Sequence, residues 1–273
     1  MLIDRFTPDW QDRLIKQKLE IADGGRLFLL IDGAFLPDFY REVQLALPGT
    51  ESVSLLFEQL PACSDKTLSV SPFLVPCTSM SSSFQRVLGK CSGWPMVSAI
   101  ETTEAISDLA KRLAAWCIVE AGDQRFNFRF PDTRRLPGIF DALSPSQRGA
   151  LAGPALRWSY IGRDGVWNDL ALPVMALAVA ERPTLDDMQF SAMVGDSEVD
   201  ETIVLLQDRG PLPERLHAET CSIVSEARRV AALCKFDQDL YVDWCEHCLY
   251  HAVGLAETDA RTAAMEWREI NSA

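Results

Sequence analysis

The chain lacks the short motifs that mark common nucleotide-binding and hydrolytic enzymes. It has no P-loop, no G-x-G-x-x-G, no H-E-x-x-H and no G-x-S-x-G string. Histidine is scarce, with 3 in 273 residues, and repeats and low-complexity tracts are absent. The absence of these motifs agrees with a role that is not catalytic, and we expect neither a cofactor nor a bound metal.

Long apolar runs are also missing. The longest, Leu170 to Ala180, is interrupted by Pro173 and is far shorter than the ~20 residues of a membrane-spanning helix. The opening residues Met1 to Trp10 carry several charges and no apolar stretch, so they do not resemble a signal peptide. We expect a soluble cytoplasmic protein that does not bind membranes.

Positive charge is sparse in the last third of the chain. Residues 181–273 hold 8 Lys and Arg against 19 Asp and Glu, a net charge of −11, whereas residues 1–180 hold 18 against 20. This asymmetry indicates two regions of different character and argues against binding to a nucleic-acid backbone. The acidic region either maintains a soluble surface or docks a basic partner, and both interpretations stay open.

The apolar patterns predict an α/β (α+β) lobe with a mixed sheet over residues 1–180 and an all-helical lobe over residues 181–273. In the first lobe, strands and helices interleave. Expected strands are 27–31, 53–57, 73–75, 96–100, 116–120, 124–130, 155–161 and 166–170, and expected helices are 11–22, 84–89, 104–115 and one that begins at the capping box Ser144–Gln147.

Strand signals end near residue 180. Thr184 is expected to cap a helix with Asp187 at its third position, and further helices are expected near 197–208, 216–234, 238–253 and 257–270. The eight cysteines are expected to be reduced and mostly buried, because no export signal is present.

One strand-like run near the middle of the chain passes directly into charged residues. Phe126, Phe128 and Phe130 alternate along one face, Arg129 points to the other, and the run continues as Pro-Asp-Thr-Arg-Arg. Proline should end the strand, and Asp132 should hydrogen-bond its own backbone to turn the chain.

Three motifs in order resemble a known family. They are LFLLIDGAFLPDFY at 27–40, FRFPDTRRL at 128–136, and Gly153-Pro154 followed by Trp158. Over roughly residues 26–170 the chain is similar to the Tap/Tec adaptors, or effector chaperones, of type VI secretion systems, long catalogued as a domain of unknown function. The resemblance implies a non-enzymatic protein that binds a toxic effector and helps load it onto the VgrG spike.

The resemblance assigns family-motif positions, which we expect to be structural, to Asp32, Gly33, Arg129, Phe130, Asp132 and Arg134. From the residues alone, Asp32 either caps the turn after a buried strand or lies where α/β proteins place ligands. The two arginines are expected to pair with Asp32 or Asp132 and so join the two motifs.

The acidic helical region is expected to recognise the effector or bridge it to the spike. Tyr241, Trp244 and Tyr250 are candidate anchors for a partner, because aromatic side chains dominate many interfaces. Packing in the core of the lobe is the alternative for each of them.

Two competing functions use cysteine. Gly89-Lys90-Cys91-Ser92-Gly93 mimics a nucleophile elbow, which would make the chain a cysteine hydrolase or amidotransferase, but the elbow needs a strand before it and a helix after it. Cys245, His247, Cys248 and His251 are zinc-ligand types and would make a metal-stabilised regulatory module. They fan out over one helix, however, and Cys245 and Cys248 continue an apolar stripe, so core packing is favoured.

Overall fold

The computed structural model describes residues 2–49, 51–61, 63–78, 80–173, 183–251 and 257–271. The chain divides into two compact units, residues 1–193 and 194–273, here named the sheet lobe and the helical lobe. The division falls inside helix α8 (Asp187–Arg209), whereas the sequence patterns placed it at residue 180.

The centre of the sheet lobe is a six-stranded sheet whose neighbouring strands are all antiparallel. Its order is β2-β3-β1-β4-β7-β8. The strands are β1 (Arg26–Ile31), β2 (Ser54–Leu55), β3 (Phe73–Pro76), β4 (Val97–Thr102), β7 (Ala155–Ile161) and β8 (Trp167–Asp169). The central strand β1 is apolar from Leu27 to Ile31 because both of its faces are buried.

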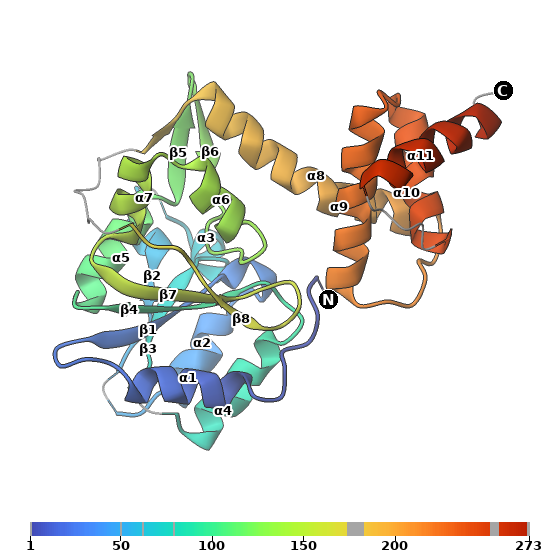
Figure 1. The fold of residues 1–273 in the computed structure, drawn as a ribbon. Coiled ribbons are helices and arrows are strands. Elements are labelled where there is room, and N and C mark those ends of the chain that lie inside the picture. The colour runs from blue at the N-terminus through green and yellow to red at the C-terminus, as the bar shows by residue number, and fades with distance from the viewer. Residues whose placement is uncertain are drawn as a thin grey trace. The chain divides into compact units, whose positions relative to one another are not determined.

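Successive residues of β1 enter two different cores, since side chains alternate across a strand. Leu27, Leu29 and Ile31 pack with α1 (Trp10–Leu19), α2 (Phe39–Ala46) and α4 (Ser82–Leu88). Phe28 and Leu30 pack on the opposite side, with α5 (Ile106–Ala115), α6 (Leu136–Ala142) and α7 (Pro145–Ala152). Helices therefore cover both faces of the sheet (Figure 1).

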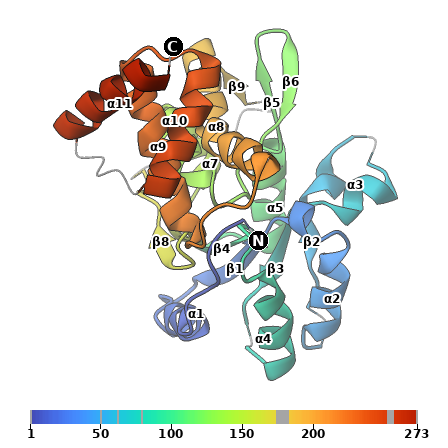
Figure 2. The same ribbon diagram turned by 90° about the vertical axis from the view of Figure 1, so that its right-hand side faces the viewer.

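A smaller sheet of order β6-β5-β9 projects from the sheet lobe, as both ribbon views show (Figures 1 and 2). Strands β5 (Ile118–Ala121) and β6 (Gln124–Asn127) form the predicted hairpin, with Gly122 in the left-handed region at φ 56°. Strand β9 (Thr184–Leu185) pairs parallel to β5. The predicted fold class, a mixed α/β lobe followed by a helical lobe, is confirmed.

Several short elements complete this lobe. They are the 3-10 turns η1 (Gly33–Phe35), η2 (Leu56–Gln59) and η3 (Gly89–Cys91) and helix α3 (Asp65–Ser69). The strand predicted over 53–57 is therefore wrong beyond Leu55, where the chain turns into η2.

The strand predicted to continue to Phe130 ends at Asn127. Its partner β5 begins at Ile118, opposite Asn127, and the residues before Ile118 turn out of α5. Phe128 N–H still donates to the Cys117 carbonyl at 2.9 Å, but no further partner strand exists beyond that point among the described residues.

Thr184 does not cap a helix, because it lies in β9 and pairs with Glu120. The cap is Asp186: its carboxylate accepts from Gln189 N–H at 2.8 Å, and the Gln189 side-chain oxygen accepts from Asp186 N–H at 3.1 Å. This capping box starts α8, which continues unbroken past Gly195 to Arg209, so the separate helix predicted at 197–208 is part of α8.

The helical lobe contains the end of α8 together with α9 (His217–Leu233), α10 (Gln238–His251) and α11 (Glu257–Asn271), which lie side by side in Figure 2. Its core includes Val224, Val230, Trp244 and Leu249. Among the described residues, no helix of either lobe combines the length and apolar character needed to cross a membrane.

Candidate functional site

The candidate sites are two clusters of charged side chains. One is the motif cluster of the sheet lobe, formed by Asp32, Phe35, Arg129, Asp132 and Arg134. The other is a groove of the helical lobe, which is described below.

Asp32 occupies the end of β1, where it caps the turn η1. Its Oδ1 accepts from Ala34 N–H at 3.0 Å, and its Oδ2 accepts from Arg129 Nη2 at 2.9 Å. Asp32 therefore caps the turn and also pairs with Arg129, while a ligand at this position stays a prediction. The carboxylate is almost fully buried, and this burial raises its pKa, an effect that Arg129 opposes.

The next residue must be glycine because the backbone passes close to another segment. A Cβ on Gly33 would lie 2.3 Å from the Ser71 carbonyl oxygen, which is closer than a carbon and an oxygen that are not bonded can approach. The Asp32-Gly33 pair is thus explained by local structure.

Asp132 organises the second motif. Its Oδ1 accepts from Arg134 N–H at 3.1 Å, which is the predicted backbone turn, and its two oxygens accept from Arg134 Nε and Nη2 at 3.1 and 2.8 Å. The same carboxylate lies 3.9 Å from Arg129 Nη2. Arg129 therefore links two buried carboxylates that are 100 residues apart in the sequence.

Phe35 completes the motif cluster. Arg129 and Arg134 hold their guanidinium groups over its ring, 5.3 and 5.7 Å from the centroid. Phe130 is fully buried in the core beneath. The bidentate pair of Arg134 with Asp132 fixes the 128–136 segment, and the bond from Arg129 to the buried Asp32 joins this segment to the end of β1.

The groove of the helical lobe has a volume of about 510 Å³ and lies between α8, α9 and the start of α10. Glu198, Thr202 and Leu205 line it from α8, because residues at i, i+4 and i+7 share one helix face. The other lining residues are Glu201, Arg228, Ala231, Ala232, Phe236, Asp237 and Tyr241.

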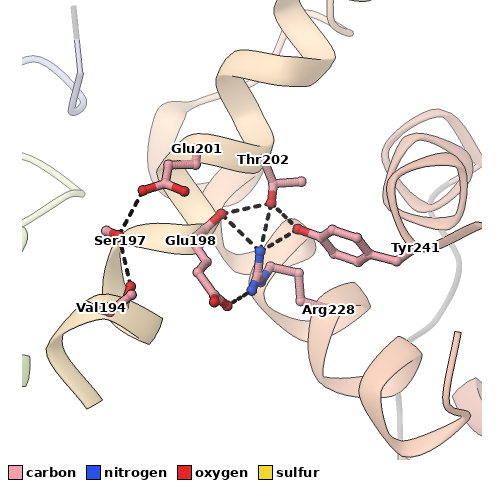
Figure 3. A network of polar contacts seen from close by, with 7 residues as sticks. All are labelled: Val194, Ser197, Glu198, Glu201, Thr202, Arg228 and Tyr241. Atoms are coloured by element: carbon pink, nitrogen blue, oxygen red, sulfur yellow. Dashed lines mark hydrogen bonds and ion pairs between the residues drawn. The ribbon is translucent and has the colours of Figure 1, made fainter. Parts of the chain in front are cut away.

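Figure 3 shows a polar network formed by Glu198, Thr202, Arg228 and Tyr241, which all line the groove. Arg228 Nη1 donates to the Glu198 carbonyl at 3.0 Å, to Thr202 Oγ1 at 2.8 Å and to the Tyr241 hydroxyl, while its Nη2 donates to the Glu198 carboxylate. The guanidinium carbon also lies 5.0 Å from the centre of the Tyr241 ring. One cation therefore joins α8, α9 and α10.

The turn between α9 and α10 positions Phe236 and Asp237 at the groove. Lys235 adopts the left-handed conformation, with φ 54°, and its N–H donates to the Ala232 carbonyl while Phe236 N–H donates to the Ala231 carbonyl. These two bonds form a Schellman motif, which ends α9. Asp237 then accepts from Leu240 N–H at 3.0 Å and caps α10.

The three predicted anchors lie in different surroundings. Tyr241 lines the groove. Trp244 is fully buried and donates its indole N–H to the Ala227 carbonyl at 3.1 Å, so it packs in the core and not on the surface of its lobe. Tyr250 is half exposed and donates to the Pro211 carbonyl at 2.7 Å. Partner binding by Tyr241 and Tyr250 stays a prediction.

Cys91 has the surroundings of a core residue. It lies in η3 after helix α4, not between a strand and a helix, and it is fully buried. Burial strongly raises the pKa of its thiol, so the nucleophilic thiolate is disfavoured. Nothing here favours the hydrolase alternative.

Cys245 and Cys248 pack in the helical core, as the apolar stripe predicted. Burial raises the pKa of each thiol to about 12. His247 and His251 instead stack on each other, with ring centres 4.3 Å apart. Within the described part of the chain, no group of three or more metal-ligand side chains converges on one point.

Sequence reasoning missed most of the groove. The face of α8 that carries Glu198, Thr202 and Leu205 was readable from spacing, but its partner Arg228 lies 30 residues away and has no local signal.

Comparisons with known proteins bear on the sheet lobe. A search of curated proteins and a search of solved structures gave no match. Residues 27–150, which begin in β1, end in α7 and contain the whole motif cluster, match the model of a family described as Domain of unknown function (DUF4123).

Proposed function

We propose that the chain is a non-enzymatic adaptor that binds a type VI secretion effector in the cytoplasm and helps load it onto the VgrG spike. The observation that carries this proposal is the family match over residues 27–150, since that family is associated with type VI secretion effectors. The match covers two of the three motifs that resemble the Tap/Tec adaptors, those at 27–40 and 128–136, in the same order.

The two lobes have different roles in this proposal. The charged groups of the motif cluster bond to one another, so we assign to the sheet lobe the role of the family scaffold. The helical lobe lies outside the matched residues and carries the groove. Cargo recognition is therefore assigned to the helical lobe, where adaptors for different effectors would differ.

Affinity capture from cells that produce the secretion machinery tests the proposal. The tagged chain should recover one effector and VgrG, as identified by mass spectrometry. An unrelated tagged protein of similar net charge, −13, controls for nonspecific electrostatic capture. Recovery of neither protein, from cells in which both are detected, would refute the adaptor function.

A further inference from the structure

The groove of the helical lobe is negatively charged. Glu198, Glu201 and Asp237 face it against one cation, Arg228. The surrounding lobe adds to this field, because residues 194–273 hold 16 Asp and Glu against 7 Lys and Arg. Field lines concentrate in such a concave, charged site and attract a ligand of opposite sign.

The cation of the groove is already engaged. Arg228 donates to Glu198, Thr202 and Tyr241, and its side chain is only 20% exposed. A carboxylate ligand would have to displace the Glu198 carboxylate to reach it. Glu201, in contrast, is an exposed lining residue that accepts from Ser197 Oγ of its own helix at 2.9 Å.

The remaining lining is apolar. Leu205 is 49% exposed although it is a large aliphatic side chain, and Ala232, Phe236 and the ring of Tyr241 extend the same lining. The volume of about 510 Å³ falls within the range of about 300–1,000 Å³ that is typical of binding clefts. Leu205, Phe236 and the Tyr241 ring line one groove, so together they offer an apolar surface to another apolar group.

We propose that this groove binds a cationic amphipathic segment of the secreted cargo, with an apolar side chain against Leu205 and Phe236 and a lysine or arginine beside Glu201. Charge complementarity selects this occupant: the lining offers carboxylates to a cation, an apolar wall to the stem of that residue, and no unpaired cation to an anion. The identification of the partner as cargo rests on the proposed adaptor function.

The chemistry of the groove can be tested without knowing the cargo. The probe is a fluorescent peptide with leucine and lysine at helical spacing, and the comparison peptide carries glutamate in place of lysine. Fluorescence anisotropy with the full chain should detect binding of the cationic peptide only, and added salt should weaken it. Equal binding of the acidic peptide would overturn the proposal.

Two variants locate the binding. Glu201→Lys and Leu205→Ser change exposed side chains, so both should fold, and each should weaken binding of the cationic peptide about tenfold or more. Glu266→Lys is the matched control, because it makes the same change in net charge on an exposed position of α11 outside the groove. It should weaken binding less than about threefold. Equal loss from Glu201→Lys and Glu266→Lys would refute the groove as the site.

The captured effector separates this inference from the adaptor function. If the effector binds wild type and Glu201→Lys with the same affinity, the groove is not its site, although the adaptor function survives. If the peptide results hold but no effector is captured, the adaptor function fails while the chemistry of the groove stands.

Discussion

Replacement of Arg129 by leucine tests how strongly the motif cluster holds the sheet lobe together. Arg129 donates to Asp32 at 2.9 Å and lies 3.9 Å from Asp132, and both carboxylates are at most 3% exposed. The substitution removes the cation and leaves Asp32 buried with the single hydrogen bond from Ala34 N–H.

The size of the loss in stability follows from how far the Asp32 and Arg129 side chains are exposed to solvent. Removal of one partner from a fully buried ion pair costs about 3–5 kcal/mol, since the other charge stays buried without compensation. The Arg129 side chain is 41% exposed, so water already screens part of the interaction. We therefore expect Arg129→Leu to lower the free energy of unfolding by about 2 kcal/mol at pH 7.

The stability lost in Arg129→Leu should depend on pH in a defined direction. Burial raises the pKa of Asp32 above the unfolded value of about 3.9, and removal of Arg129 should raise it further. A carboxyl with a raised folded-state pKa favours folding below the unfolded pKa, and this contribution disappears as pH rises through the folded pKa. The penalty of Arg129→Leu should therefore shrink as the pH is lowered from 7 towards about 4.

Urea denaturation measures the difference in the free energy of unfolding between wild type and Arg129→Leu, and hydrogen exchange of β1 peptides assigns this difference to the sheet lobe. Arg41→Leu is the control, because Arg41 pairs with Asp38 on the surface at 3.1 Å with side chains 65% and 52% exposed, and its loss should change stability by less than about 0.5 kcal/mol. An effect of Arg129→Leu as small as this, or one independent of pH, would refute the reasoning.

Three further predictions concern individual residues. Lys235→Gly should raise the free energy of unfolding by up to about 1 kcal/mol in urea denaturation, because glycine adopts the left-handed conformation without a Cβ penalty. Proton NMR should give His247 a pKa below the usual value of about 6.5, since burial and His251 both disfavour its charged form, and His251→Gln should raise it. In the native protein a thiol reagent should modify Cys63, which is partly exposed, much faster than the buried Cys91; rapid loss of Cys91 would contradict its packing.

Much of the secondary structure of the sheet lobe could be predicted from the sequence where local signals are strong. The apolar run of β1 ends at an Asp-Gly turn, and Ser144 with Gln147 forms the predicted capping box. The arginines of the second motif were expected to pair with Asp32 or Asp132, and Arg129 bonds to Asp32. Each of these features depends on residues close in sequence or on one strong ion pair.

The errors arise where distant segments decide the outcome. Thr184 has the residue type of a helix cap, but pairing with Glu120 draws it into β9, and Asp186 with Gln189 supplies the cap instead. The length of β6 depends on where its partner β5 begins, and the residues of β6 carry no information about that position. A glycine such as Gly195 lowers the stability of a helix by about 1 kcal/mol, and α8 forms across this position in spite of the loss.

The groove could not be predicted for the same reason. Acidic composition was compatible with a soluble surface or with a partner-binding lobe, and neither interpretation indicates a groove. The groove exists because Arg228 joins helices whose contacting residues lie 13 and 30 positions away. Trp244, the largest aromatic side chain among the predicted anchors, is buried, since its size favours the core of a small helical lobe as much as an interface.

Reconstitution from purified proteins tests the adaptor function most directly. The chain, VgrG and the captured effector are mixed in pairs and together, and the complexes are measured by size-exclusion chromatography with light scattering. The account predicts that the effector and VgrG form a stable complex only when the chain is present. Equal association of effector and VgrG without the chain, or no binding of the chain to either protein, would contradict it.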